Sequence, residues 1–401
     1  MRYFKYLIFV FIILIFMTIC SYKQMNLIDD TWYIVDDYAI LMLCKTTEQD
    51  CYKVLMSKLK GNGDSLKDAI KLLEKMEQDV GVKNALGVGY LRLGKFQEAN
   101  KTFEEALQIA GSDEDRACIL SNLAEVMIYQ ENTESAKSYL EDALKLGVDD
   151  PLKQLVLQSN LATIDNLYKG NHVKEVANIK SLLKKEKSIL GSNQFVGIFN
   201  YKTLGYICFQ DGSMKKCEYY INKALELNDN TYQYVTIEAD LYEALSLIYT
   251  SYDFNKSIEY VNKGIEILEN QKVYDNYDLL SLYVLRGNLY MKIDYPNVNL
   301  AIEDYEYVLE QCSPYHDLAA VSYYNLAYAL EYLGDEDQVT ESYARAYYIW
   351  NREGYEDSNQ EIKKALRKIY EKQDDKDDDY ESWFQTQIIQ GKEDLSKLWK
   401  E

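Results

Sequence analysis

The seven cysteines are the side chains of this sequence that are best suited to chemistry. Cys208 and Cys217 stand four residues before and five residues after Gly212, so a turn at the glycine would bring them face to face across two helices. Such a pair is either a disulfide or two small apolar core residues, since cysteine packs well in protein interiors. Cys44 and Cys51, which could close a short loop, present the same two alternatives. Both stay open, because an oxidising compartment permits disulfides without requiring them.

Histidine, a common zinc ligand and general base, is scarce in this chain. His172 and His316 are the two histidines, and neither has a Cys, His or acidic partner at metal-ligand spacing on a shared helix face. Gly87-Val88-Gly89 is a fragment of a phosphate-binding pattern, but it falls inside a predicted helix. No nucleophile is placed beside a base. The sequence therefore predicts a protein that is not an enzyme and that uses no cofactor, metal or small-molecule substrate.

The charge of the chain limits the kind of partner that it can bind. It has 65 acidic and 44 basic side chains, which gives a net charge of −21. A nucleic-acid partner is excluded on this ground, because phosphate contacts need clustered Lys and Arg. The negative charge instead favours encounter with a basic ligand. With 47% hydrophobic residues and only three prolines, the composition indicates a folded and mainly helical protein.

The amino terminus has the three parts of an export signal. Arg2 and Lys5 precede an apolar run, which ends at Ile19 and is followed by Cys20. The run of 14 residues is short for a membrane span, which needs roughly 20. The sequence Met-Thr-Ile-Cys resembles the lipobox of bacterial lipoproteins, in which the cysteine is lipidated, although Ile19 stands where that motif prefers a small residue. We therefore expect residues 1–19 to be a signal peptide or an uncleaved anchor, with the body of the chain on the outer face of a bacterial cell membrane.

A repeat fills most of the chain. A large apolar residue followed by a small one recurs at steps of 37 to 43 residues, or at twice that step. The pairs are Leu86-Gly87, Leu123-Ala124, Leu161-Ala162, Leu204-Gly205, Leu245-Ser246 and Leu326-Ala327. In the first unit the apolar spacing predicts one helix that ends at Gly94 and a second helix with Ala99 and Phe103 on one face. Gly87 and Ala99 are small because two helices must approach closely there, and Phe103 fills the space beside them.

This pattern resembles the tetratricopeptide repeat, and the match is close to complete over residues 86–107. The resemblance implies an all-α fold, a right-handed superhelical solenoid of antiparallel helix pairs whose concave face binds peptides or proteins. It covers residues 48–372 as about eight units. Residues 20–47 are then a tether and an amino-terminal cap, and residues 373–401 are an acidic linker and an amphipathic helix. The side chains expected to cap the first unit are Trp32, Tyr33, Val35, Tyr38, Ile40 and Leu41.

An asparagine row is predicted to line the ligand groove. Asn122, Asn160 and Asn325 each directly precede the anchor leucine of their unit. In tetratricopeptide proteins that grip extended peptides, asparagines at matching places look like a ladder to the ligand backbone. An amide suits this task because it carries both a donor and an acceptor. The alternative is that these asparagines only cap or solvate a helix face. Selectivity for ligand side chains is expected from Tyr129, Asn166, Tyr206, Tyr328 and Tyr332.

Together these features predict a membrane-tethered extracytoplasmic scaffold that binds a peptide or protein partner. The alternative is a peptide-sensing receptor whose superhelix changes shape when the ligand binds. A scaffold should keep its dimensions when its ligand is added, whereas a receptor should become more compact.

Overall fold

The computed structural model describes most of the chain. The described residues are 33–35, 39–45, 63–130, 132–168, 172–191, 194–231, 235–250, 253–270, 277–293, 295–314, 316–353, 356–373 and 379–398. The chain divides into two compact units, unit 1 over residues 1–241 and unit 2 over residues 242–401. The predictions for Cys20, Cys51, Trp32 and Tyr38 concern residues outside the described ones.

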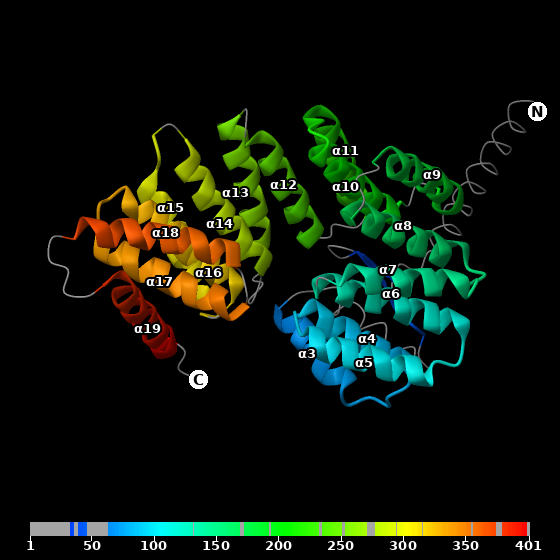
Figure 1. Cartoon of the computed structure of the whole chain (residues 1–401). Helices are drawn as coiled ribbons and strands as arrows, with labels where there is room; N and C mark the ends of the chain where they lie inside the picture. Colours follow the sequence, from blue (N-terminus) through cyan, green and yellow to red (C-terminus); the bar gives the residue numbers. More distant parts are fainter. Residues whose placement is uncertain are drawn as a thin grey trace, which may run out of the picture. The chain divides into compact units, whose positions relative to one another are not determined.

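Unit 1 is built of antiparallel helix pairs, which are drawn in blue to green in Figure 1. The helices are α3 (Gly63–Leu73), α4 (Val80–Arg92), α5 (Phe96–Ile109), α6 (Asp113–Tyr129), α7 (Thr133–Lys145), α8 (Pro151–Tyr168), α9 (His172–Leu190), α10 (Phe195–Gln210) and α11 (Met214–Thr231). Helix α12 (Val235–Tyr249) runs across the division between the units. The closest packing is between the two members of a pair, as in α4 with α5, α6 with α7 and α10 with α11.

Unit 2 continues the same arrangement. Its helices are α13 (Phe254–Asn270), α14 (Tyr277–Lys292), α15 (Val298–Gln311), α16 (Asp317–Glu331), α17 (Glu336–Glu353), α18 (Glu356–Lys372) and α19 (Tyr380–Leu398). The pairs α14 with α15 and α16 with α17 pack along their lengths. The carboxy-terminal helix α19 packs against α17. The predicted all-helical repeat architecture is therefore confirmed.

Small residues hold the members of a pair together, as the sequence pattern predicts. A Cβ atom added to Gly87 would lie 2.6 Å from the Phe103 ring, and one added to Gly287 would lie 2.6 Å from the Tyr305 ring. Real Cβ atoms do not approach other heavy atoms so closely, so only glycine allows these helices to meet. The turns between paired helices also match the prediction. Gly94 joins α4 to α5 with a φ of 70°, in the left-handed region that favours glycine.

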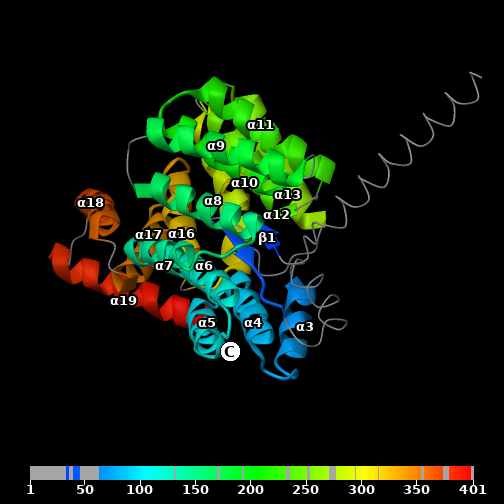
Figure 2. The ribbon, with the colours of Figure 1, turned by 90° about the vertical axis from the view of Figure 1, so that its right-hand side faces the viewer.

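A short β-hairpin accompanies the helices of unit 1. Strand β1 (Tyr33–Val35) pairs antiparallel with β2 (Ile40–Met42), and Ile34 lies opposite Leu41. β2 contacts α6 and β1 contacts α10. Figure 2 shows β1, in dark blue, beside helix α10, which it contacts. Tyr33, Ile40 and Leu41 were expected to cap the first unit, and in the structure the described part of this segment lies along α6 and α10. The side chains of Trp32, Val35 and Tyr38 are outside the described residues.

Candidate peptide-binding site

Two of the predicted asparagines hold an extended backbone that belongs to the chain itself. The Ile40 amide donates to Asn160 Oδ1 at 2.9 Å, and Asn160 Nδ2 donates to the Ile40 carbonyl at 3.1 Å. Asn122 binds Met42 in the same way. The Met42 amide donates to Asn122 Oδ1 at 2.9 Å, and Asn122 Nδ2 donates to the Met42 carbonyl at 2.7 Å. Each amide side chain thus pairs with both polar groups of one residue, as a neighbouring β-strand would.

A third asparagine extends this row by one repeat. The Cys44 amide donates to Asn84 Oδ1 at 3.1 Å. We call Asn84, Asn122 and Asn160 the asparagine ladder and residues 39–44 the bound segment. The ladder residues stand on α4, α6 and α8, and they hold Cys44, Met42 and Ile40 in that order. The bound segment therefore runs opposite to the order of the repeats, with two residues for each repeat.

Asn84 was missed in the sequence because it lies two residues before its anchor leucine, whereas Asn122 and Asn160 lie one residue before theirs. A search for asparagine on either of these two positions would have found it. The three side chains are fully buried, which excludes the alternative that they only solvate an exposed face. Buried amides of this kind need partners, and the extended backbone supplies them to both polar atoms of Asn122 and Asn160 and to Oδ1 of Asn84.

The strand geometry explains why alternate residues meet the ladder. In an antiparallel pair, successive residues direct their N–H and C=O groups to opposite edges of the strand. The N–H and C=O groups of Leu41 point to β1, where Ile34 lies opposite. Those of Ile40 and Met42 point to the asparagines of the helices. One edge of β2 is thus satisfied by β1 and the other edge by the asparagine ladder.

The side chains of the bound segment are buried on both faces. Ala39, Ile40, Leu41, Met42, Leu43 and Cys44 are each at most 4% exposed. Burial of a large aliphatic side chain stabilises a fold by about 1.5–3 kcal/mol. The ladder supplies direction and register, and this apolar burial supplies most of the affinity for the segment.

Hydroxyl groups on the same helices fix the ladder amides. Asn160 Nδ2 also donates to Ser121 Oγ at 3.0 Å, and this bond links α8 to α6. One repeat further on, Asn200 Nδ2 donates to Ser159 Oγ at 3.2 Å. The bond to Ser121 restrains the Asn160 amide in the orientation in which it pairs with Ile40, and restraint of this kind lowers the entropy lost when an extended segment binds.

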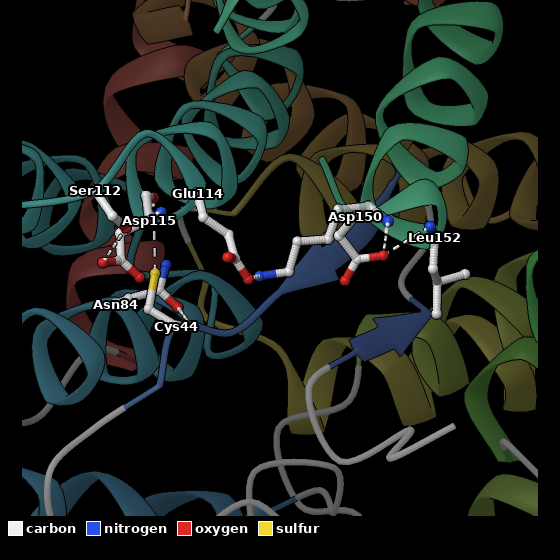
Figure 3. A network of polar contacts seen from close by, with 8 residues as sticks. Cys44, Asn84, Ser112, Glu114, Asp115, Asp150 and Leu152 are labelled. Carbon is white, nitrogen blue, oxygen red and sulfur yellow. Dashed lines mark hydrogen bonds and ion pairs between the residues drawn. The ribbon is translucent and has the colours of Figure 1, made fainter. Parts of the chain in front are cut away.

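A cluster of polar side chains, which includes Asn84, Glu114 and Asp115, surrounds the Cys44 end of the bound segment (Figure 3). The Cys44 thiol lies 3.7 Å from the Asp115 carbonyl oxygen, and Lys153 forms an ion pair with Glu114. Burial acts to lower the pKa of Lys153, but the neighbouring Cys118 and Glu114 outweigh it and raise that pKa. The hydrogen bond from Lys153 lowers the pKa of Glu114. Lys153 therefore carries a positive charge beside the buried thiols.

The other predicted site residues of unit 1 are not gathered around the bound segment. Tyr129 is half-buried, and its ring stacks on Phe96 with centroids 4.7 Å apart. Tyr206 lies on α10 with the Lys202 ammonium 6.0 Å from its ring centre. Asn166 belongs to α8, but its side chain lies outside the described residues.

Three predicted residues stand together on α16 of unit 2 and directly after it. Asn325 Nδ2 donates to Asn288 Oδ1 at 2.9 Å, and Asn288 also accepts from the Tyr305 hydroxyl at 2.7 Å. Tyr328 and Tyr332 are 46% and 54% exposed, and their rings meet edge to face at 5.8 Å. We call Asn325, Tyr328 and Tyr332 the unit 2 patch.

The cysteines of the structure are thiols. Cys208 and Cys217 are both buried, and both are free thiols in the structure. Burial raises the pKa of the Cys217 thiol to about 12, so this thiol is unreactive at neutral pH. Cys44 is likewise a buried thiol, and Cys51 is not among the described residues.

Membrane-spanning helices and metal-binding clusters are both absent from the described residues. None of the helices described by the structure is long and apolar enough to span a membrane. Within the same residues, no group of three or more His, Cys, Asp or Glu side chains is arranged to hold a metal ion.

Comparison with known proteins identifies the repeat. Residues 80–147 match the family model of the tetratricopeptide repeat. This stretch contains α4 to α7 and therefore two of the three ladder asparagines. No curated protein matches the sequence of the chain significantly.

Solved structures share the fold at low sequence identity. A Rap protein complexed with the Competence and Sporulation Factor is 16% identical with a TM-score of 0.52, over 82% of this chain and 89% of that one. Yeast Tom70 is 14% identical with a TM-score of 0.51, over 83% and 68%. A STAND protein with a tetratricopeptide repeat sensor, PH0952 from Pyrococcus horikoshii, is 19% identical with a TM-score of 0.51, over 78% of this chain. The present chain spans only 48% of the Pyrococcus protein.

Proposed function

We propose that this protein is a membrane-tethered, extracytoplasmic scaffold that binds an extended segment of a peptide or protein partner. The observation that carries the proposal is the asparagine ladder, which pairs with main-chain groups of an extended segment. Main-chain pairing is independent of the sequence that is bound, so the same helices suit a segment supplied by another chain. The tetratricopeptide match over residues 80–147 supports a role in protein binding.

The unit 2 patch is the proposed site for the partner as long as the ladder of unit 1 holds the bound segment. The ladder of unit 1 already holds the bound segment, whereas the two tyrosines of the patch are exposed. Asn325 occupies the same place before its anchor leucine as Asn122 and Asn160. Tyrosine combines a large apolar ring with a hydroxyl, which makes it frequent at interfaces. The net charge of −21 favours a partner with basic side chains.

The tether is proposed from the amino-terminal sequence. Twelve residues separate Cys20 from Tyr33 at the start of β1. A chain of this length reaches at most about 40 Å, so a lipid on Cys20 would keep unit 1 close to the membrane surface. Labelling of cells with a clickable palmitate analogue should mark the wild type and not Cys20→Ala. A wild type that remains unlabelled but pellets with membranes would indicate the uncleaved anchor.

The binding proposal is tested by site-specific photocrosslinking in cells. A photoreactive phenylalanine analogue at position 328 should capture a partner, and Asn325→Ala in the same chain should reduce the yield strongly. The same analogue at position 295, where Tyr295 is 89% exposed, serves as the control and should capture nothing specific. Equal capture at both positions would refute the unit 2 patch as the binding site.

The receptor alternative predicts a different physical response. The purified partner segment would then change the radius of gyration of the chain in small-angle scattering. For the scaffold that we propose, this radius stays the same at saturating partner.

A further inference from the structure

The end of the bound segment brings together two cysteines that are far apart in the sequence. Cys44 follows β2, and Cys118 lies in α6, one turn beyond Asp115. The Cys44 thiol is 3.7 Å from the Asp115 carbonyl oxygen, and the fully buried Cys118 follows Asp115 by three residues, on the same face of α6. The Cys44 amide is fixed by Asn84. Both cysteines are therefore held by the main chain of their own elements, and they lie beside the same turn of α6.

The surroundings favour the thiolate of Cys118, whereas burial and the neighbouring Cys118 raise the pKa of Cys44. The hydrogen bond from Cys44 lowers the pKa of Cys118, and the Lys153 ammonium acts in the same direction. Lys153 is held in place by its ion pair with Glu114, and its side chain is 9% exposed. A cation and a hydrogen-bond donor beside a thiol are the features that make a cysteine a good nucleophile.

We propose that Cys44 and Cys118 are a redox pair whose disulfide locks the bound segment onto the asparagine ladder. The oxidant is an external disulfide, either a small molecule or an oxidoreductase. The Cys118 thiolate attacks one sulfur of that disulfide and releases the other as a thiol. The Cys44 thiolate then attacks the Cys118 sulfur of the mixed disulfide, and the second thiol leaves. Two protein thiols are oxidised to one disulfide, and one external disulfide is reduced to two thiols, which take up the two protons that the protein thiols lose.

Opening of the bound segment controls this reaction. Both cysteines are at most 1% exposed, so the oxidant reaches them only when residues 39–44 lift away from the helices. Once the disulfide between Cys44 and Cys118 has formed, Cys44 can no longer move away from α6. The reduced protein can exchange the bound segment for a segment in trans, whereas the oxidised protein cannot. The chemical pairing does not depend on the proposed function, and only this consequence for exchange rests on it.

The pairing is tested on the purified full-length chain. The protein is treated with oxidised glutathione, alkylated with N-ethylmaleimide and digested without reduction. Mass spectrometry should find one cross-linked peptide pair that contains Cys44 and Cys118, 2 Da lighter than the two thiols. Cys51→Ala should retain this cross-link, and Cys44→Ser or Cys118→Ser should lose it. A cross-link from Cys44 to Cys51, or alkylation of both Cys44 and Cys118 after oxidation, would overturn the proposal.

The lock is tested by limited proteolysis within residues 33–45 in mild urea. We expect the oxidised wild type to be cleaved at least tenfold more slowly than the reduced wild type. Cys118→Ser should be cleaved at the reduced rate under both conditions, which controls for effects of the oxidant elsewhere. Equal cleavage of the oxidised and reduced wild type would show that the bond, if formed, does not hold the segment.

Discussion

Replacement of Asn122 by alanine tests how the asparagine ladder holds the bound segment. The change removes the hydrogen bonds to the Met42 amide and carbonyl, at 2.9 Å and 2.7 Å. Both main-chain groups stay buried, because Met42 is 1% exposed. A buried polar group left without its partner costs about 1–3 kcal/mol. Two such groups give about 2–6 kcal/mol, and relaxation that admits water would bring the loss toward the lower value.

Hydrogen exchange at the Met42 amide measures this loss locally. A loss of about 2 kcal/mol corresponds to exchange that is roughly 30-fold faster, since about 1.4 kcal/mol is a factor of ten. The matched control is Asn325→Ala, which stands at the same place in its repeat but bonds to a side chain of its own unit. The control should leave the exchange of Met42 unchanged.

Asn122→Asp adds a pH-dependent test of the same contact. An aspartate accepts from the Met42 amide but donates to the Met42 carbonyl only when it is protonated. Burial raises the pKa of such a carboxyl group, so the variant should be closer to wild type at pH 4 than at pH 8. Unchanged Met42 exchange in Asn122→Ala, or an Asn122→Asp variant that is insensitive to pH, would refute the role of the ladder.

Three further predictions concern helix packing and buried charged groups in the two units. Gly87→Leu should lower the free energy of unfolding by about 1–3 kcal/mol through overpacking, whereas Gly111→Leu, with open space around it, should change the urea midpoint little. Burial raises the pKa of Glu186 to about 8, so this group binds a proton in the folded state between about pH 4.5 and 8. Folding stability should fall by about 5 kcal/mol as the pH rises through this window, and Glu186→Gln should remove that dependence in urea titrations at pH 5 and 8.5. Arg286→Met should cost about 3–5 kcal/mol in urea unfolding because it leaves the buried Asp304 carboxylate without its ion-pair partner, and Arg286→Met with Asp304→Leu should recover most of the loss.

The helical repeat could be predicted from the sequence because its signals are local. Gly87 and Phe103 belong to adjacent helices, and the period of the apolar residues places them opposite each other. The turn at Gly94 is encoded by the glycine itself. Such features depend on neighbours within a single repeat of about 40 residues, so they are visible without knowledge of the whole fold.

The partner of the asparagines could not be predicted in the same way. Asn122 and Asn160 were identified as backbone-binding residues, but the backbone that they hold lies 80 and 120 residues away in the same chain. The short apolar run of residues 39–44 has no period that distinguishes a strand from a buried cap. Only the three-dimensional contacts show that it lies on the ladder.

The central claim is that the asparagine ladder recognises an extended backbone. It is tested most directly by binding of a fluorescent peptide of residues 37–47 to the full chain carrying Ile40→Asp and Met42→Asp, which weaken its own bound segment. We predict saturable binding in anisotropy titrations, which is lost with Asn122→Ala and Asn160→Ala in the same chain. It should also be lost when Met42 of the peptide is proline, which lacks the N–H that Asn122 accepts. Equal binding of the proline peptide, or no binding of either peptide, would contradict the account.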